Sequence, residues 1–112
     1  MCHDGLFDLY SFYYSTEELW FPEHDLQGLP WLNPEHYQQY NPAQPDLIKG
    51  WDTPMLVIHG GLDFRIDQSQ SLGAFTALQR QGIPSKLLYF PNGQTQRLWT
   101  RTCDATGGGT QQ

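Results

Sequence analysis

The chain has 112 residues, with twelve acidic against six basic side chains and a formal net charge of −6 at pH 7. Because no cluster of Lys or Arg offers a surface for phosphates, we expect no nucleic-acid partner. No apolar stretch approaches the roughly 20 residues that span a bilayer, so we expect no membrane partner. The amino terminus also lacks the basic and apolar segments of a signal peptide. The length suits one domain or part of one.

Cysteine and histidine spacing gives no sign of a metal site. Cys2 and Cys103 are the only cysteines, without a C-x-x-C motif or a histidine pair at zinc spacing. We therefore expect no metal, and we interpret the two cysteines as ordinary thiols.

The first half of the chain is rich in aromatic residues and proline. Ser15 or Thr16, followed by Glu17 and Glu18, favours the start of a short helix, because a hydroxyl accepts from exposed N–H groups there and acids suit the positive helix end. Six prolines between positions 22 and 54 disfavour regular structure. The pattern predicts an irregular surface segment with one short helix at residues 35 to 40.

Residues 54 to 90 carry the clearest structural pattern. Four consecutive apolar residues from Met55 are typical of a strand buried in a parallel sheet. A helix capped by Asp67 or Ser69 should follow and end at Gly82, before a second strand at residues 85 to 90. We expect the buried face of this helix to carry Leu72, Ala74, Phe75 and Leu78. The chain is predicted to be of the α/β class, with a parallel strand-helix-strand unit at residues 54 to 90.

The carboxyl-terminal residues change character. Residues 92 to 112 are rich in Gly, Thr and Gln, without strand alternation or a helical apolar face. We predict a divergent, disordered tail over this range and a folded part over residues 1 to 91.

Asp63 is the first candidate for chemistry. It follows the predicted buried strand on a loop that begins with Gly60 and Gly61, and ligands collect at the carboxyl ends of parallel strands. A carboxylate there can accept an N–H from a histidine and hold the ring for acyl transfer. An alternative is that Asp63 only pairs with Arg65 or caps the following helix.

Three blocks in a fixed order resemble a known family. They read N-P-E-H-Y-Q-Q-Y-N-P from position 33, T-P-M-L-V-I-H-G-G-L-D-F-R-I from position 53, and A-F-T-A-L-Q-R-Q-G-I-P-S-K-L-L-Y-F-P from position 74. Together they resemble the carboxyl-terminal part of the α/β-hydrolase domain of the prolyl oligopeptidase family of serine peptidases. The C-H-D-G start and the E-E-L-W-F-P-E-H-D stretch resemble its fungal dipeptidyl-peptidase V branch.

The resemblance implies an incomplete α/β-hydrolase fold and a role for two residues. Asp63 matches the acid of the Ser-His-Asp triad, and Arg65 matches an arginine to which we assign a structural role. The implied parent protein is a serine-type dipeptidyl-peptidase that acts on peptide substrates outside the cell and needs no cofactor. Nothing in the resemblance indicates a partner chain.

Two triad members are expected to lie outside this sequence. No G-x-S-x-G elbow occurs, so we expect the nucleophilic serine to precede Met1. Family members carry the catalytic histidine after the last strand, whereas no histidine follows His59 here. We therefore expect a fragment that is inactive as an isolated chain.

The remaining chemical residues have structural interpretations. His3 and His59 match non-catalytic positions of the family, His24 and His36 are expected at the surface, and the Glu17-Glu18 pair is interpreted as a solvated helix start. The aromatic residues are expected mainly to pack, although a proline-accepting pocket or a sugar-stacking surface is an alternative. They are Tyr10, Phe12, Tyr13, Tyr14, Trp20, Phe21 and Trp31.

Two other functions stay open at this point. One is a non-catalytic hydrolase remnant that binds another chain through an exposed sheet edge. The other is an esterase of the same fold, because the triad chemistry is shared.

Overall fold

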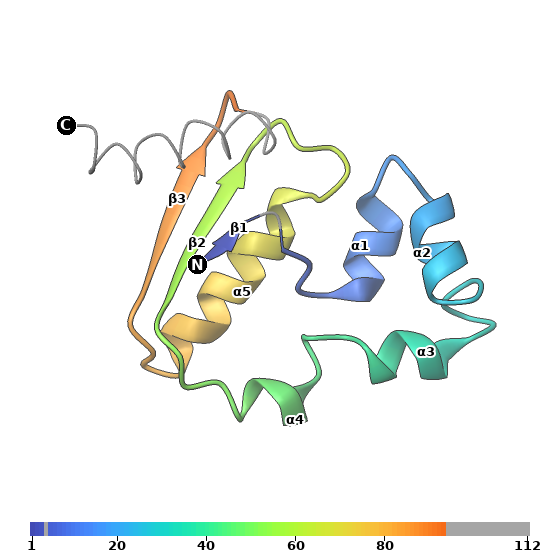
Figure 1. The fold of residues 1–112 in the computed structure, drawn as a ribbon, viewed down its shortest axis with the longest axis horizontal. Helices are drawn as coiled ribbons and strands as arrows, with labels where there is room; N and C mark the ends of the chain where they lie inside the picture. The colour runs from blue at the N-terminus through green and yellow to red at the C-terminus, as the bar shows by residue number, and fades with distance from the viewer. Residues whose placement is uncertain (4, 94–112) are drawn as a thin grey trace.

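The computed structural model describes residues 1–3 and 5–93, arranged as a small sheet with one helix against it and a group of short helices beside it (Figure 1). In chain order the elements are β1 (Cys2–His3), α1 (Leu9–Ser15), α2 (Trp20–Asp25), α3 (Pro34–Gln39), α4 (Pro45–Ile48), β2 (Met55–Gly60), α5 (Gln68–Arg80) and β3 (Ser85–Phe90).

The sheet has three parallel strands in the order β1-β2-β3. The register pairs Met55 with Ser85 at one end of β2 and Gly60 with Phe90 at the other. Strand β1 pairs with the middle of β2, where Cys2 lies opposite Val57. The predicted parallel strand-helix-strand unit at residues 54 to 90 is therefore confirmed, and the carboxyl ends of β2 and β3 lie at the same edge.

Helix α5 begins and ends as the sequence predicts, but it buries a different face. Asp67 is its N-cap and accepts the Ser69 N–H at 3.1 Å, and Gly82 follows the helix with a φ of 71°. The prediction that Leu72 belongs to the buried face is wrong, because its side chain is 42% exposed. The buried residues of the helix are Gln70, Ser71, Ala74 and Leu78.

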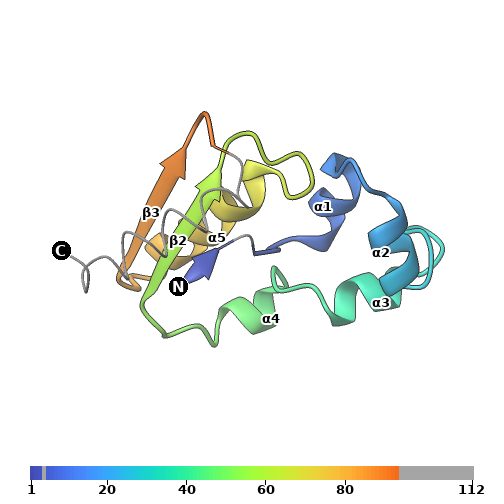
Figure 2. The same ribbon diagram turned by 45° about the horizontal axis from the view of Figure 1, so that its top comes forward.

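Two apolar clusters form the core. The first joins α5 to the sheet through Val57, Leu78 and Ile83. The second lies among the short helices, which gather away from β3 (Figure 2). Its buried members are Leu9, Tyr13, Leu26 and Tyr37. Burial raises the pKa of Tyr37 to about 12, which keeps its hydroxyl neutral while it donates to the Gly28 carbonyl at 2.9 Å.

The helices of the first half differ from the prediction. No helix starts at Ser15 or Thr16; instead α1 ends at Ser15, and the next helix begins at Trp20. The cap of α1 is Asp8, whose side chain accepts the Tyr10 N–H. The predicted helix at residues 35 to 40 is confirmed as α3, which starts at Pro34, where proline suits the first helical turn. The prediction of a single short helix in this segment is wrong, because α4 also starts there, at Pro45.

The buried side-chain amide of Gln70 joins α5 to the start of α1. Gln70 is 1% exposed, and its Oε1 accepts the N–H groups of Phe7 and Asp8 at 2.9 and 2.8 Å. Its Nε2 donates to Ser11 at 2.7 Å. Because every polar atom of this side chain has a partner, Gln70 ties the entrance of α1 to α5 without an unsatisfied group.

The predicted tail reaches beyond the described residues, which end at position 93, and Cys103 also lies outside them. Among the helices that the structure describes, none is both long enough and apolar enough to cross a membrane.

Gly61 permits the closest approach between the two loops at the carboxyl edge. Its N–H donates to the Phe90 carbonyl at 2.8 Å. A Cβ at this position would lie 2.5 Å from the Tyr89 hydroxyl oxygen, 2.7 Å from the Pro91 carbonyl oxygen and 3.0 Å from the Pro91 Cα. The reason for glycine is thus the neighbouring backbone and not a left-handed turn, since only Gln27, Gly28 and Gly82 have positive φ in the described part.

We predict that Gly61→Ala destabilises the fold by about 1–3 kcal/mol, because the added methyl meets backbone atoms that cannot move independently. Thermal unfolding measures the change. Gly50→Ala is the control, since its Cβ would meet nothing closer than Leu47 O at 3.6 Å. Equal melting temperatures for the two variants would contradict this account of the edge.

Candidate functional site

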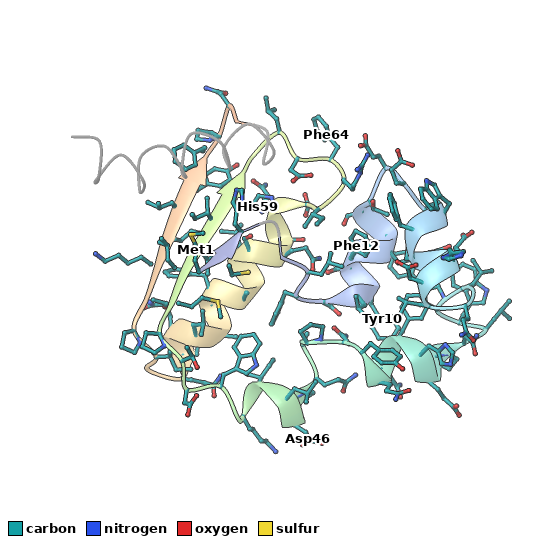
Figure 3. The ribbon with its side chains drawn as sticks, viewed as in Figure 1. Met1, Tyr10, Phe12, Asp46, His59 and Phe64 are labelled. Carbon is teal, nitrogen blue, oxygen red and sulfur yellow. The ribbon has the colours of Figure 1, made fainter. Side chains whose placement is uncertain are left out.

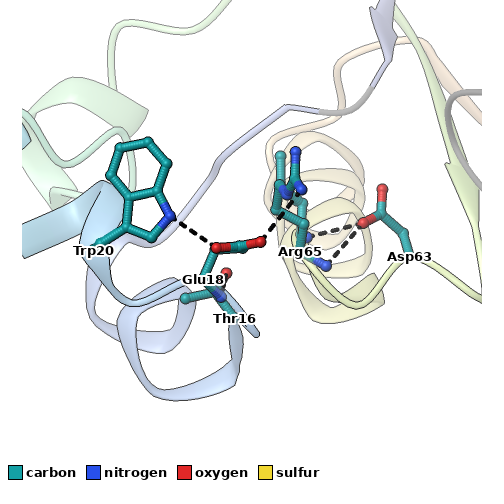
Figure 4. Close-up of polar contacts among 6 residues, drawn as sticks. Thr16, Glu18, Trp20, Asp63 and Arg65 are labelled. Carbon is teal, nitrogen blue, oxygen red and sulfur yellow. Dashed lines mark hydrogen bonds and ion pairs between the residues drawn. The ribbon is translucent and has the colours of Figure 1, made fainter.

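Asp63 lies on the loop between β2 and α5, at the carboxyl edge of the sheet (Figure 1). Figure 4 shows its contact with Arg65. Its Oδ1 accepts two backbone N–H groups, from Arg65 at 3.1 Å and from Ile66 at 3.0 Å. The side chain is partly buried. Two backbone donors hold one face of the carboxylate in a fixed direction and close the loop into a tight turn.

The alternative that Asp63 only pairs with Arg65 or caps the following helix is only partly met. The cap of α5 is Asp67, and the Ser69 hydroxyl and N–H lower the pKa of that carboxyl below its ordinary value. Arg65 places its Nη2 3.6 Å from Glu18 Oε1. Asp63 therefore shapes its own loop and accepts the backbone N–H of Arg65, while Asp67 caps the helix and Glu18 lies beside the Arg65 guanidinium.

Arg65 links this loop to the segment between α1 and α2. Its guanidinium also lies 5.6 Å from the centroid of the Phe21 ring. Glu18 in turn accepts the Trp20 Nε1–H at 2.8 Å, and the Glu17 N–H donates to the Phe64 carbonyl at 3.1 Å. Of the pair interpreted as a solvated helix start, Glu17 is exposed and the Glu18 side chain is 35% exposed, but neither residue starts a helix, since α2 begins at Trp20. A structural role for Arg65 fits these contacts.

An apolar cavity of about 330 Å³ lies beside the Asp63 loop. Figure 3 shows Phe12 on α1 among the side chains between the loop and the helices. The cavity is lined by Leu6, Leu9, Phe12, Phe21, Pro22, Asp25, Leu26, Tyr40, Arg65 and Ile66. A more open hollow of about 700 Å³ lies at the opposite edge, around Met55 and Ser85, away from Asp63.

The predicted aromatic cluster is divided between core, cavity and surface. Tyr13 is buried and Phe12 faces the cavity, so packing accounts for these rings. Trp20 and Trp31 are 58% and 61% exposed, and Trp20 stacks on Phe21 with 3.9 Å between ring centroids.

The histidines fall into two pairs. His24 is exposed beside Asp25, with 3.0 Å between Nδ1 and Oδ1, and His36 is partly exposed. His59 is fully buried, and its Nδ1 lies 2.9 Å from Ser71 Oγ. Burial lowers the pKa of both His3 and His59 below 6.5, and the nearby Asp63 carboxylate opposes this effect at each ring.

Within residues 1–3 and 5–93, no group of three or more His, Cys, Asp or Glu side chains is placed to hold a metal ion. The site is therefore described by its carboxylate, its arginine and its apolar cavity.

The profile of the Prolyl oligopeptidase family matches residues 1–94. The chain belongs to the prolyl oligopeptidase family. Dipeptidyl-peptidase 5 of Schizosaccharomyces pombe is 46% identical over 90 residues, which are 80% of this chain and 13% of that protein. Dipeptidyl-peptidase 5 of Porphyromonas gingivalis is 42% identical over 94 residues, 82% of this chain and 14% of that protein. The resemblance to this family of serine peptidases is confirmed.

Solved structures support the fold. The acylaminoacyl peptidase of Pyrococcus horikoshii superposes with a TM-score of 0.70 at 23% identity, covering 82% of this chain and 15% of that one. The incomplete α/β-hydrolase fold is thus confirmed. This member of the prolyl oligopeptidase family spans less than a sixth of the length of the relatives it matches.

The sequence did not reveal two of the contacts around Asp63. The Glu18–Arg65 pair joins residues 47 positions apart, and neither neighbourhood has a pattern that selects the other. The His59–Ser71 contact had a weak signal, since Ser71 lies one turn after the predicted cap, where a polar residue on the sheet-facing side needs a partner.

We predict that the free energy of unfolding falls as the pH drops below about 6.5. His3 and His59 bind protons less readily when folded, so the unfolded chain binds more protons between 6.5 and the folded pKa values. Each ring contributes a slope of at most about 1.4 kcal/mol per pH unit.

Urea unfolding between pH 7.5 and 5.5 measures this slope. His59→Gln should reduce it, whereas Thr76→Ala, which removes an exposed hydroxyl and no titratable group, should leave it unchanged. Identical slopes for His59→Gln and the wild type would contradict the assignment.

Proposed function

We propose that this chain is a segment of a serine dipeptidyl-peptidase and that Asp63 is the acid of its Ser-His-Asp triad. The observation that carries the proposal is a carboxylate held by two backbone N–H groups, at the carboxyl edge of a parallel sheet, in a member of a serine peptidase family. Relatives that match 80% of the chain bear the name dipeptidyl-peptidase 5.

The geometry suits the work of a triad acid. In acyl transfer a serine attacks the peptide carbonyl and a histidine takes its proton. The acid accepts the other N–H of that histidine, fixes the tautomer and stabilises the imidazolium that forms. A carboxylate that can rotate freely would do this poorly, and the Arg65 and Ile66 N–H groups restrict the rotation of Asp63.

The apolar cavity supports a peptide as substrate. Its volume of about 330 Å³ lies in the range of small-molecule sites, and its wall includes Ile66 of the Asp63 loop and Phe12 of α1. We assign it to an apolar side chain of the substrate. Arg65 and Asp25 are its charged members and would meet polar backbone groups of the peptide.

A chimaera tests the role of Asp63. The 90 matched residues of the S. pombe dipeptidyl-peptidase 5 are replaced by those of this chain, and kcat/KM is measured on a dipeptidyl substrate. Asp63→Asn should lower kcat about 10⁴-fold, because an amide favours the wrong histidine tautomer.

Asp67→Asn is the matched control in the same loop, because asparagine also caps helices, and its activity should stay within about threefold of the unmodified chimaera. Full activity of the Asp63→Asn chimaera would overturn the proposal.

We predict that the isolated chain shows no peptidase turnover. Its sequence has no G-x-S-x-G motif and no histidine after His59, and the serine and histidine act as a unit, so loss of either removes most catalysis. A fluorophosphonate probe should leave the purified chain unlabelled, while an active serine peptidase treated in parallel is labelled. Stoichiometric labelling would show that the chain carries a nucleophile of its own.

A further inference from the structure

We propose that His59, hydrogen-bonded to Ser71, is a positioning residue that holds the loop carrying Asp63. The inference rests on the proposed function, since it concerns the same carboxylate, but it assigns a role to two residues outside the triad. His59 and Ser71 act on Asp63 by joining the two ends of its loop and not by direct contact with substrate.

His59 occupies a place where the fold otherwise uses apolar side chains. It is the fifth residue of β2, two positions after Val57, and it points to the same face of the sheet, toward α5 (Figure 3). Its ring is fully buried, and Nδ1 lies 2.9 Å from the Oγ of Ser71, which is itself 3% exposed. The pair therefore joins the end of β2 to the first turns of α5.

The His59–Ser71 pair spans the loop that carries Asp63, because His59 lies at the end of β2 and Ser71 in the first turn of α5. Gly60, the residue after His59, accepts the Asp63 N–H with its carbonyl at 3.2 Å. The N–H of Ile66, the residue before the N-cap of α5, donates to Asp63 Oδ1 at 3.0 Å. Asp63 is thus held from both ends of a loop whose ends the His59–Ser71 contact joins.

Stability alone does not explain this pair. A buried ring nitrogen without a full hydrogen bond is unfavourable, and an apolar side chain of similar size would avoid that penalty. A polar pair in a core is explained when its directional contacts fix a neighbouring group. Here the neighbouring group is the turn that closes on Asp63.

The surroundings of the His59 ring favour its neutral state. The Asp63 and Asp67 carboxylates attract a proton toward His59, while burial and His3 oppose it. Since burial is the largest of these effects, the ring stays neutral and its contact with Ser71 persists near neutral pH.

Solvent exchange of single amides in the full 112-residue chain tests the inference by NMR. The amides are those of Arg65 and Ile66, which donate to Asp63. Ser71→Ala should speed their exchange about fivefold, the effect of losing roughly one hydrogen bond, and leave the amides of β3 unchanged. It should also shift the His59 ring nitrogen signals.

Thr76→Ala is the control, because it removes an exposed hydroxyl of the same helix that donates to the Leu72 carbonyl. Its amide exchange and ring signals should match the wild type. Unchanged Arg65 and Ile66 exchange in Ser71→Ala, an equal increase throughout the chain, or a His59 ring that titrates like a solvent-exposed histidine would overturn the inference.

The chimaera then separates this inference from the proposed function. Ser71→Ala should lower kcat about fivefold with KM unchanged, because a loosened acid affects the chemical step and not substrate binding. If Asp63→Asn abolishes activity while Ser71→Ala leaves kcat unaltered, the positioning role fails and the triad role stands. If Asp63→Asn is fully active, the triad role fails whatever the amide exchange shows.

Discussion

The parallel pairing of β2 with β3 is the constraint on which the rest of the structure depends. Six residues of each strand are in register, so both strands end at one edge, with Gly60 opposite Phe90. Beyond the strands, the Leu62 N–H donates to the Gly93 carbonyl at 3.0 Å, and the two loops stay together. In a triad of this fold the acid follows one strand and the histidine follows the next, so this pairing is what allows the two to meet.

Buried polar residues fix the orientation of α5, which the apolar clusters alone do not determine. The apolar contacts of α5 hold it against the sheet, but they are not directional. Gln70 directs the same helix toward the entrance of α1, and Ser71 directs it toward His59. Gln70 and Ser71, which are adjacent on α5, thus hold two parts of the structure against the same helix. Gln70 holds the start of α1, beside the apolar cavity, and Ser71 holds the end of β2, which leads to the Asp63 loop.

Local patterns in the sequence were sufficient for the strand-helix-strand unit and for the place of Asp63. Four apolar residues before Gly60, the cap at Asp67 and the stop at Gly82 all act within a few residues of one another, and the structure agrees with each. Tertiary contacts decided the rest. Leu72 is exposed because the helix turns Gln70 and Ser71 inward to meet partners more than ten positions away. The helix expected from Ser15 or Thr16 does not form, because α1, capped by Asp8, extends to Ser15, and the Thr16 hydroxyl accepts the Glu18 N–H in the turn before α2.

The central claim is that Asp63 receives the histidine of a serine peptidase. A crystal structure of the chimaera with the S. pombe protein, inhibited by a fluorophosphonate, measures the distance from the Asp63 carboxylate to the nearest histidine ring nitrogen of the host. The account predicts a hydrogen bond of about 2.6–3.2 Å, with Oδ1 still bound to the Arg65 and Ile66 N–H groups. An inhibited enzyme in which no histidine lies within reach of Asp63, or in which another carboxylate holds the ring, would contradict it.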